Sequence, residues 1–167
     1  MIKVLGLYGS PRKGGNSDLL LDRALEGARR SGAETSALYV RDLEIRPCQE
    51  CYGCLRTGMC VVQDDMQKVY PRLQEADAIL LSSPIFFYGL SAQAKTLIDR
   101  CQCLWCSNDL ERKRTGVKAP LDRGTGYLIA VGATGGRNLF VGAEWVARYF
   151  FEELRKSYEG GLLVRKV

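Results

Sequence analysis

Continuous apolar runs alternate with amphipathic stretches along the whole chain. Runs of the kind that form buried strands occupy residues 2–8, 35–40, 76–83, 127–131 and 161–167. Apolar residues recur at helical spacing over residues 16–30, from about residue 65, and over residues 91–104 and 138–157. Strands that alternate with helices in this way form a parallel sheet covered by helices on both faces. The pattern therefore predicts a doubly wound α/β fold with a five-stranded parallel sheet in the order 2-1-3-4-5.

The predicted helix boundaries depend on capping residues and on helix breakers. Asn16 or Ser17 can cap the first helix. Pro71 lies inside the helix that begins near Asp65, and a proline there is expected to kink or divide the helix. Residues 107–124 are polar, basic and interrupted by glycine and proline, so they are predicted to form an exposed excursion.

Length and composition indicate one domain. The chain has 167 residues, of which 46% are apolar and 26% charged, so residues 1–167 are predicted to form a single globular unit. No window approaches the roughly 18 consecutive apolar residues that a membrane span needs, and the apolar N-terminus favours a first strand over a signal peptide. A cytoplasmic location with no membrane partner is therefore expected. The net charge of +5 includes no basic run with interleaved aromatics, which argues against nucleic acid as a partner.

The chain contains no histidine. This excludes Ser-His-Asp and Cys-His catalysis, together with every metal site that needs an imidazole ligand. Chemistry must therefore come from cysteine, carboxylate, backbone or a bound cofactor. No catalytic acid or base is expected from the protein, and a redox cofactor that carries its own reaction fits this limit.

A glycine-rich loop, residues 9–17, joins the first strand to the first helix and reads Gly-Ser-Pro-Arg-Lys-Gly-Gly-Asn-Ser. A helix N-terminus offers free N–H groups and a positive dipole end, and Ser10, Arg12, Asn16 and Ser17 add side-chain donors. The loop lacks the Lys-Ser/Thr pair of triphosphate loops and the glycine spacing of dinucleotide loops. A monophosphate is the better fit, and an ordinary glycine–proline turn is the alternative.

Two further loops suit a flat aromatic ligand. Residues 83–89 follow the third strand and read Ser-Pro-Ile-Phe-Phe-Tyr-Gly. Such rings suit the planar body of a flavin, and backbone N–H groups can reach its ring nitrogens, although a hydrophobic turn under the next helix is the alternative. The glycine-rich loop over residues 132–137 would allow close approach to the other edge of the ring.

The seven cysteines fall into two groups. The first group lies in residues 41–64, a long segment without periodicity, and reads Cys48-x2-Cys51-x2-Cys54-x5-Cys60. This spacing lets four thiolates converge on one iron–sulfur cluster, as in bacterial ferredoxin motifs. A four-cysteine zinc site, a disulfide and free thiols remain the alternatives. Cys101, Cys103 and Cys106 form the second group and are interpreted as core residues.

The three loops together resemble the NAD(P)H-dependent FMN reductase branch of the flavodoxin-like proteins, and the cysteine motif ahead of Asp64-Asp65-Met66 resembles its iron–sulfur flavoprotein subgroup. The resemblance implies that Ser10, Arg12, Asn16 and Ser17 bind the FMN phosphate. It implies that the isoalloxazine lies among Pro84, Ile85, Phe86, Phe87, Thr134, Gly135 and Gly136. It further implies that Cys48, Cys51, Cys54 and Cys60 hold a [4Fe–4S] cluster.

The function implied by the resemblance is that of an FMN-dependent oxidoreductase. Two-electron chemistry is expected at the flavin and one-electron transfer at the cluster, with NAD(P)H or a reduced ferredoxin-type partner as electron donor and a small molecule as a possible redox partner. The alternatives are an NAD(P)H-dependent FMN or quinone reductase without a cluster, a non-catalytic flavodoxin-like electron carrier, and a zinc-stabilised binding module.

Self-association is also expected. The last predicted helix carries too wide an apolar surface for one buried stripe, through Phe140, Val141, Ala143, Trp145, Val146, Tyr149, Phe150 and Phe151. The sequence ends at its fifth predicted strand, where this fold usually adds a closing helix, so a partner or further chain is expected to cover that sheet edge. A homodimer or homotetramer is therefore predicted.

Overall fold

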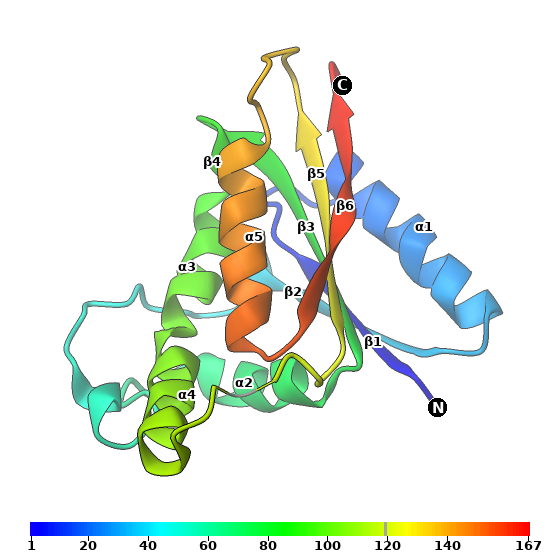
Figure 1. The fold of residues 1–167 in the computed structure, drawn as a ribbon. Helices are drawn as coiled ribbons and strands as arrows, with labels where there is room; N and C mark the ends of the chain where they lie inside the picture. The colour runs from blue at the N-terminus through cyan, green and yellow to red at the C-terminus, as the bar shows by residue number, and fades with distance from the viewer. Residues whose placement is uncertain (119) are drawn as a thin grey trace.

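Five parallel strands form the centre of the computed structural model, which describes residues 1–118 and 120–167 (Figure 1). The strands are β1 (Lys3–Tyr8), β2 (Glu34–Tyr39), β3 (Ala78–Phe86), β5 (Thr125–Gly132) and β6 (Ser157–Arg165). The helices are α1 (Asn16–Arg30), α2 (Met66–Glu75), α3 (Ala92–Arg100), α4 (Gln102–Thr115) and α5 (Val141–Glu153). Two short 3-10 helices, η1 (Val40–Asp42) and η2 (Gly53–Leu55), lie between β2 and α2. The alternation of strands and helices confirms the predicted α/β class.

The parallel strands lie in the order β2-β1-β3-β5-β6, which confirms the predicted flavodoxin-like order 2-1-3-4-5. Within β1, Gly6 pairs with Ala37 of β2 on one side and with Leu80 of β3 on the other. A sixth strand, β4 (Gly89–Leu90), was not predicted, and it pairs antiparallel with the end of β3. Because β4 is short and directly follows β3, the two form a hairpin that leaves the parallel order unchanged.

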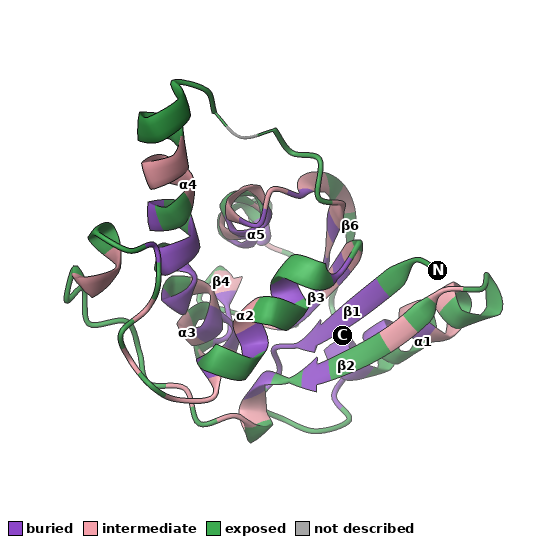
Figure 2. Ribbon diagram, turned by 90° about the horizontal axis from the view of Figure 1, so that it is seen from below, coloured by how far each residue is buried: buried purple, intermediate pink, exposed green. Residues whose placement is uncertain are grey.

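Helices cover both faces of the sheet, with α1 on one face and α2, α3 and α5 on the other (Figure 1). The larger core cluster packs the sheet against α2, α3 and α5, through residues such as Leu7, Leu73 and Phe151. The smaller cluster lies under α1, where a Cβ on Gly6 would come within 2.7 Å of Leu25 Cδ1. Buried residues accordingly lie along the strands and on the inward sides of the helices (Figure 2).

Two helix boundaries differ from the predicted ones around α4. The helix expected over residues 91–104 is divided at Cys101 into α3 and α4. α4 then continues to Thr115, so the excursion predicted over residues 107–124 is helical in its first half, while residue 119 lies outside the described residues. Apolar periodicity misses this helix because its surface is polar and carries ion pairs between residues three and four apart.

The remaining differences are small. β6 begins at Ser157, before the predicted residue 161, because α5 ends at Glu153 and the chain turns at Arg155 with a φ of 58°. α2 runs through Pro71 without being divided. Across residues 1–118 and 120–167, no helix combines the length and apolar character that crossing a membrane requires.

Lys156 is a fully buried lysine between α5 and β6. Its Nζ donates hydrogen bonds to the carbonyl oxygens of Ala76, at 2.6 Å, and Arg123, at 2.7 Å. The side chain thus ties the end of α2 and the segment before β5 to the start of β6. Burial lowers the pKa of Lys156 to about 8.

We expect Lys156→Met to lower the free energy of unfolding by about 1–3 kcal/mol, because two carbonyls lose their donor. The loss should be larger at pH 10 than at pH 8, by about 1–2 kcal/mol. The unfolded chain keeps the Lys156 proton up to the ordinary pKa of 10.5, so it binds more protons than the folded state in this window, and wild-type stability rises with pH.

Urea denaturation at the two pH values measures this difference. Lys118→Met, which removes an exposed ion pair with Glu152, serves as the control and should change stability by less than about 0.5 kcal/mol. If Lys156→Met lost the same free energy of unfolding at both pH values, the lowered pKa of Lys156 would be contradicted.

Candidate functional site

The loop over residues 9–17 leads from β1 into α1 and brings most of the predicted phosphate ligands to the helix start. Ser10 and Ser17 are both buried. The guanidinium of Arg12 lies over Gly15, where an added Cβ would come within 3.3 Å of Arg12 Nε. Asn16 is exposed at the first position of the helix. Ser10 already bonds its own loop, because its Oγ accepts from Arg12 N at 3.1 Å.

The N-terminus of α1 is not capped as predicted. Its N-cap is Gly15, and no side chain among the described residues makes the capping hydrogen bond, so the expectation that Asn16 or Ser17 caps the helix was wrong. The cause is register, because Asn16 and Ser17 already lie inside the first turn. The first N–H groups of the helix therefore stay available to an anion.

A buried ion pair that the sequence analysis missed supports this loop. Asp18 Oδ2 accepts from Gly14 N at 3.0 Å and pairs with Arg41 Nη1 at 2.9 Å. Arg41 also donates to the carbonyl oxygen of Ser10 at 3.2 Å, and its guanidinium lies over the ring of Tyr39. Arg41 follows β2, so it joins the segment after β2 to the segment after β1. The sequence carries no local signal for this long-range contact.

The aromatic residues after β3 lie at the tip of the β3–β4 hairpin. Phe87 and Tyr88 form the turn with positive φ values of 47° and 63°, a left-handed conformation that bulky residues rarely adopt. Phe86 and Phe87 are exposed, whereas Pro84 and Ile85 are half-buried. The strained turn therefore presents aromatic surface to the solvent at the carboxyl end of β3.

The loop after β5 contacts this hairpin through Tyr88. A Cβ on Gly136 would lie 2.6 Å from Tyr88 Oη, and a Cβ on Gly142, in the first turn of α5, would lie 2.8 Å from the Tyr88 carbonyl oxygen. Thr134 and Gly135 are exposed beside it. The structure thus brings the two predicted flavin loops together at the edge of the sheet where α1 begins (Figure 1).

The four cysteines of the first group line one cavity of about 500 Å³ beside α4. Cys48 and Cys51 are exposed, whereas Cys54 and Cys60 are half-buried, and all are free thiols. Within residues 1–118 and 120–167 no three cysteine or carboxylate side chains come close enough to hold a metal ion, so full convergence is not seen.

Two cysteines of the second group also line this cavity, which the sequence analysis missed. Cys103 and Cys106 are buried as predicted, and Cys106 Sγ lies 3.5 Å from Cys54 Sγ. Their spacing of three residues, which puts both on one face of α4, was the signal available. Burial raises the pKa of the Cys106 thiol to about 11.

Arg100, the last residue of α3, forms one wall of the cysteine cavity. Its side chain is fully buried and pairs with Asp64. Burial alone would raise the pKa of Asp64, but the hydrogen bonds from Arg100 and from backbone N–H groups hold it below its ordinary value. Arg100 looks in the sequence like an ordinary basic residue, so the sequence analysis named Asp64 after the cysteine motif but missed its partner.

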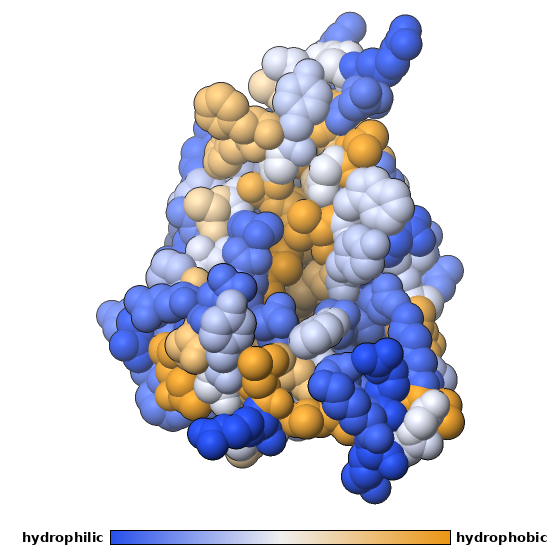
Figure 3. Space-filling model, turned by 60° about the vertical axis from the view of Figure 1, so that its left-hand side comes forward, coloured by the Kyte–Doolittle hydropathy of each residue, from blue (hydrophilic) through white to orange (hydrophobic). Residues whose placement is uncertain are grey.

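A larger groove of about 760 Å³ lies between α3, α4 and α5. Figure 3 shows it as a hollow with a hydrophobic floor. Trp105, Trp145 and Tyr149 are exposed along it, whereas Phe150 and Phe151 of the predicted apolar surface are buried in the core. The wide apolar surface of α5 therefore serves the core on one side and lines this groove on the other.

Comparisons with known proteins identify the family of this chain. Residues 2–141 match the family model described as NADPH-dependent FMN reductase, and the chain belongs to this family. An iron–sulfur flavoprotein of Methanocaldococcus jannaschii is 40% identical over 118 residues, which cover 71% of this chain and 61% of that relative. An iron–sulfur flavoprotein of Archaeoglobus fulgidus is 31% identical over 98% of this chain and 92% of its own length.

A solved structure supports the fold. An azoreductase from Bacillus anthracis superposes with a TM-score of 0.70 at 14% identity, covering 99% of this chain and 88% of that one. The chain spans about three fifths of the length of the first relatives that it matches. The family match and the two relatives confirm the resemblance to the FMN reductases and to the iron–sulfur flavoproteins that the motifs indicated.

The close packing behind the loop over residues 9–17 predicts that Gly9 cannot be replaced without loss of stability. A Cβ on Gly9 would lie 2.7 Å from the Ser82 carbonyl oxygen and 2.8 Å from Ala94 Cβ, so Gly9→Ala should lower the free energy of unfolding by about 2 kcal/mol or more. Gly27→Ala meets no neighbour within 4 Å inside α1 and should raise it by about 0.5–1 kcal/mol. Urea denaturation of both variants tests the contrast, and equal effects would contradict it.

Proposed function

We propose that this protein is an FMN-dependent oxidoreductase that also carries a [4Fe–4S] cluster. The observation that carries the proposal is the presence of two sites: an uncapped helix start beside an aromatic hairpin, and a cavity lined by four cysteines that lie close together in the sequence. Family membership and the names of the relatives point the same way.

The residues at the first site fit FMN. Arg12 and the open N–H groups of α1 are suited to the phosphate, and buried Ser17 adds a hydroxyl. Pro84 to Phe87 and Thr134 to Gly136 would flank the ring, with the exposed aromatic surface of Phe86 and Phe87 excluding water from it. When bound, FMN supplies two-electron redox chemistry, with NAD(P)H as the donor that the family description suggests.

The residues at the second site fit an iron–sulfur cluster. Cys48, Cys51, Cys54 and Cys60 supply the thiolates that such a cluster requires, and they line the same cavity. Arg100, on the wall of that cavity, has a buried Nε–H without a hydrogen-bond acceptor among the described residues. A buried donor without an acceptor is costly, so it favours an acceptor such as cluster sulfur. The cluster would supply one-electron transfer.

A cluster-free NAD(P)H-dependent FMN or quinone reductase is the second candidate. Two observations favour it: the four cysteines are free thiols whose sulfurs do not meet at one point among the described residues, and Cys54 contacts Cys106. A non-catalytic electron carrier is distinguished from both enzymes by the absence of steady turnover of NAD(P)H with a quinone.

Arg12→Ala combined with Ser17→Ala should weaken FMN binding by about tenfold to a hundredfold, because two donors to a charged acceptor are lost. Titration of flavin-free protein with FMN, followed by quenching of flavin fluorescence, measures the dissociation constant. Arg23→Ala combined with Ser31→Ala, the same changes within α1 and at its C-cap, is the control and should leave the dissociation constant unchanged. Equal affinity in all three proteins would show that the loop is only a turn.

Protein purified without oxygen should contain about four iron and four acid-labile sulfide per chain. Cys60→Ala should remove both, whereas Cys101→Ala should not, because Cys101 lies outside the cysteine cavity. Chemical iron and sulfide analysis, with the absorption spectrum, gives the result. Wild-type protein with flavin but without iron under these conditions would favour the cluster-free reductase.

Partners and location remain part of the proposal. The exposed aromatic residues along the α3–α4–α5 groove support self-association as a homodimer or homotetramer. The cytoplasmic location and the absence of nucleic-acid and membrane partners likewise stay predictions.

A further inference from the structure

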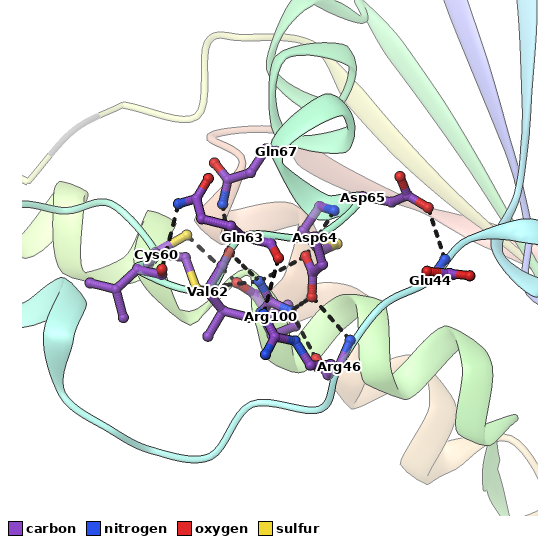
Figure 4. Close-up of polar contacts among 12 residues, drawn as sticks. Glu44, Arg46, Cys60, Val62, Gln63, Asp64, Asp65, Gln67 and Arg100 are labelled. Carbon is purple, nitrogen blue, oxygen red and sulfur yellow. Dashed lines mark hydrogen bonds and ion pairs between the residues drawn. The ribbon is translucent and has the colours of Figure 1, made fainter.

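Arg100 reaches from the end of α3 into the segment that carries the last cysteine (Figure 4). Its Nη2 donates to Cys60 Sγ at 3.4 Å and to the carbonyl oxygen of Val62 at 3.3 Å. Its Nη1 donates to the Arg46 carbonyl oxygen at 2.8 Å, and both terminal nitrogens bond the carboxylate of Asp64. The guanidinium of Arg100 therefore contacts the cysteine segment on both sides: at Arg46, before the first cysteine, and at residues 60–64, from the last cysteine onward.

The two ends of the cysteine segment, at Arg46 and at Asp64, are also hydrogen-bonded to each other directly. Asp64 Oδ2 accepts from Arg46 N at 3.0 Å, and Arg46 Nη2 donates to the Gln63 carbonyl oxygen at 3.0 Å. Asp64 Oδ1 accepts from Met66 N at 3.1 Å, at the start of α2. Asp64 thus holds the guanidinium of Arg100 in a fixed orientation from the side of α2, and that orientation leaves Nη2 against the sulfur of Cys60.

We infer that Arg100 is a positioning residue for the iron–sulfur site, one that holds Cys60 in place and donates a hydrogen bond to its sulfur, so that the bound cluster is easier to reduce. The inference rests on the proposed function, because it concerns the cluster assigned there. It adds a residue outside the cysteine motif and gives it a measurable electronic effect.

The sign of the effect follows from charge. Reduction adds one electron to a cluster already ligated by thiolates, and a cationic N–H donor at the sulfur stabilises that added negative charge. Removing the donor therefore makes the reduction potential more negative. A residue that only braced the loop would alter cluster retention and leave the potential of the retained cluster unchanged.

The test compares variants that separate charge, hydrogen bonding and folding. Arg100→Met combined with Asp64→Asn removes both charges together, so no buried carboxylate is left unpaired and the net charge is unchanged. Arg100→Lys keeps the charge but loses the planar fork. Arg112→Met combined with Asp109→Asn removes an Arg–Asp pair from the surface of α4 and is the matched control.

The measurement is a redox titration of anaerobically purified protein, followed by electron paramagnetic resonance, with iron content and FMN occupancy determined on the same samples. We expect the double variant at Arg100 and Asp64 to lose about tenfold in the ratio of reduced to oxidised cluster at a fixed solution potential. That loss is a shift of about 59 mV to more negative potential for one electron. Arg100→Lys should fall between wild type and the double variant, and the control should match wild type.

The outcomes separate this inference from the proposed function. Wild-type protein without iron and sulfide overturns both. A wild-type cluster whose potential is unchanged in Arg100→Lys and in the double variant overturns the inference alone. If the double variant keeps its FMN but loses its iron, Arg100→Lys decides the inference: a more negative cluster potential in that variant supports it, and an unchanged potential overturns it.

Discussion

The parallel arrangement of the sheet is the constraint on which the candidate flavin site depends. Parallel strands place all their carboxyl ends at one edge, so loops far apart in the sequence meet there. The loop before α1, the β3–β4 hairpin and the loop after β5 lie at one edge for this reason: Gly9 packs against Ser82 of β3, and Tyr88 of the hairpin packs against Gly136. None of these loops alone has a shape specific to a flavin, and the sheet supplies the specificity by combining them.

The cysteine site depends on a different principle. It lies beside α4, away from the hairpin and the loop after β5, and it is held by hydrogen bonds between loop backbone and buried charges (Figure 1). An irregular segment cannot use a strand ladder to satisfy its backbone groups. Arg100 and Asp64 take over that role, because they bond backbone groups of Arg46 and Val62 and so hold the path of the loop.

The positions of the strands and of most helices could be predicted because they follow from local apolar periodicity, and the order of the parallel strands because strands alternate with helices. The β3–β4 hairpin could not, since Phe87 and Tyr88 adopt a left-handed turn that their residue types disfavour. The helical first half of residues 107–124 was missed because that segment is polar. The pairs Asp18–Arg41 and Arg100–Asp64 escaped prediction for another reason: each joins residues distant in sequence, and only the fold brings them together.

Arg41 has a consequence for how the two sites influence each other. It sits at the start of the cysteine segment, yet its guanidinium holds Asp18 and the carbonyl of Ser10 in the phosphate loop. An anion bound at the start of α1 would lie close to Asp18 and Arg41, the charges that fix the beginning of the cysteine segment. Thermodynamic linkage requires that any free energy which one ligand gains through Arg41 be returned equally to the other. If the two sites are coupled through Arg41, the change in FMN affinity on loading the cluster would equal the change in cluster affinity on binding FMN.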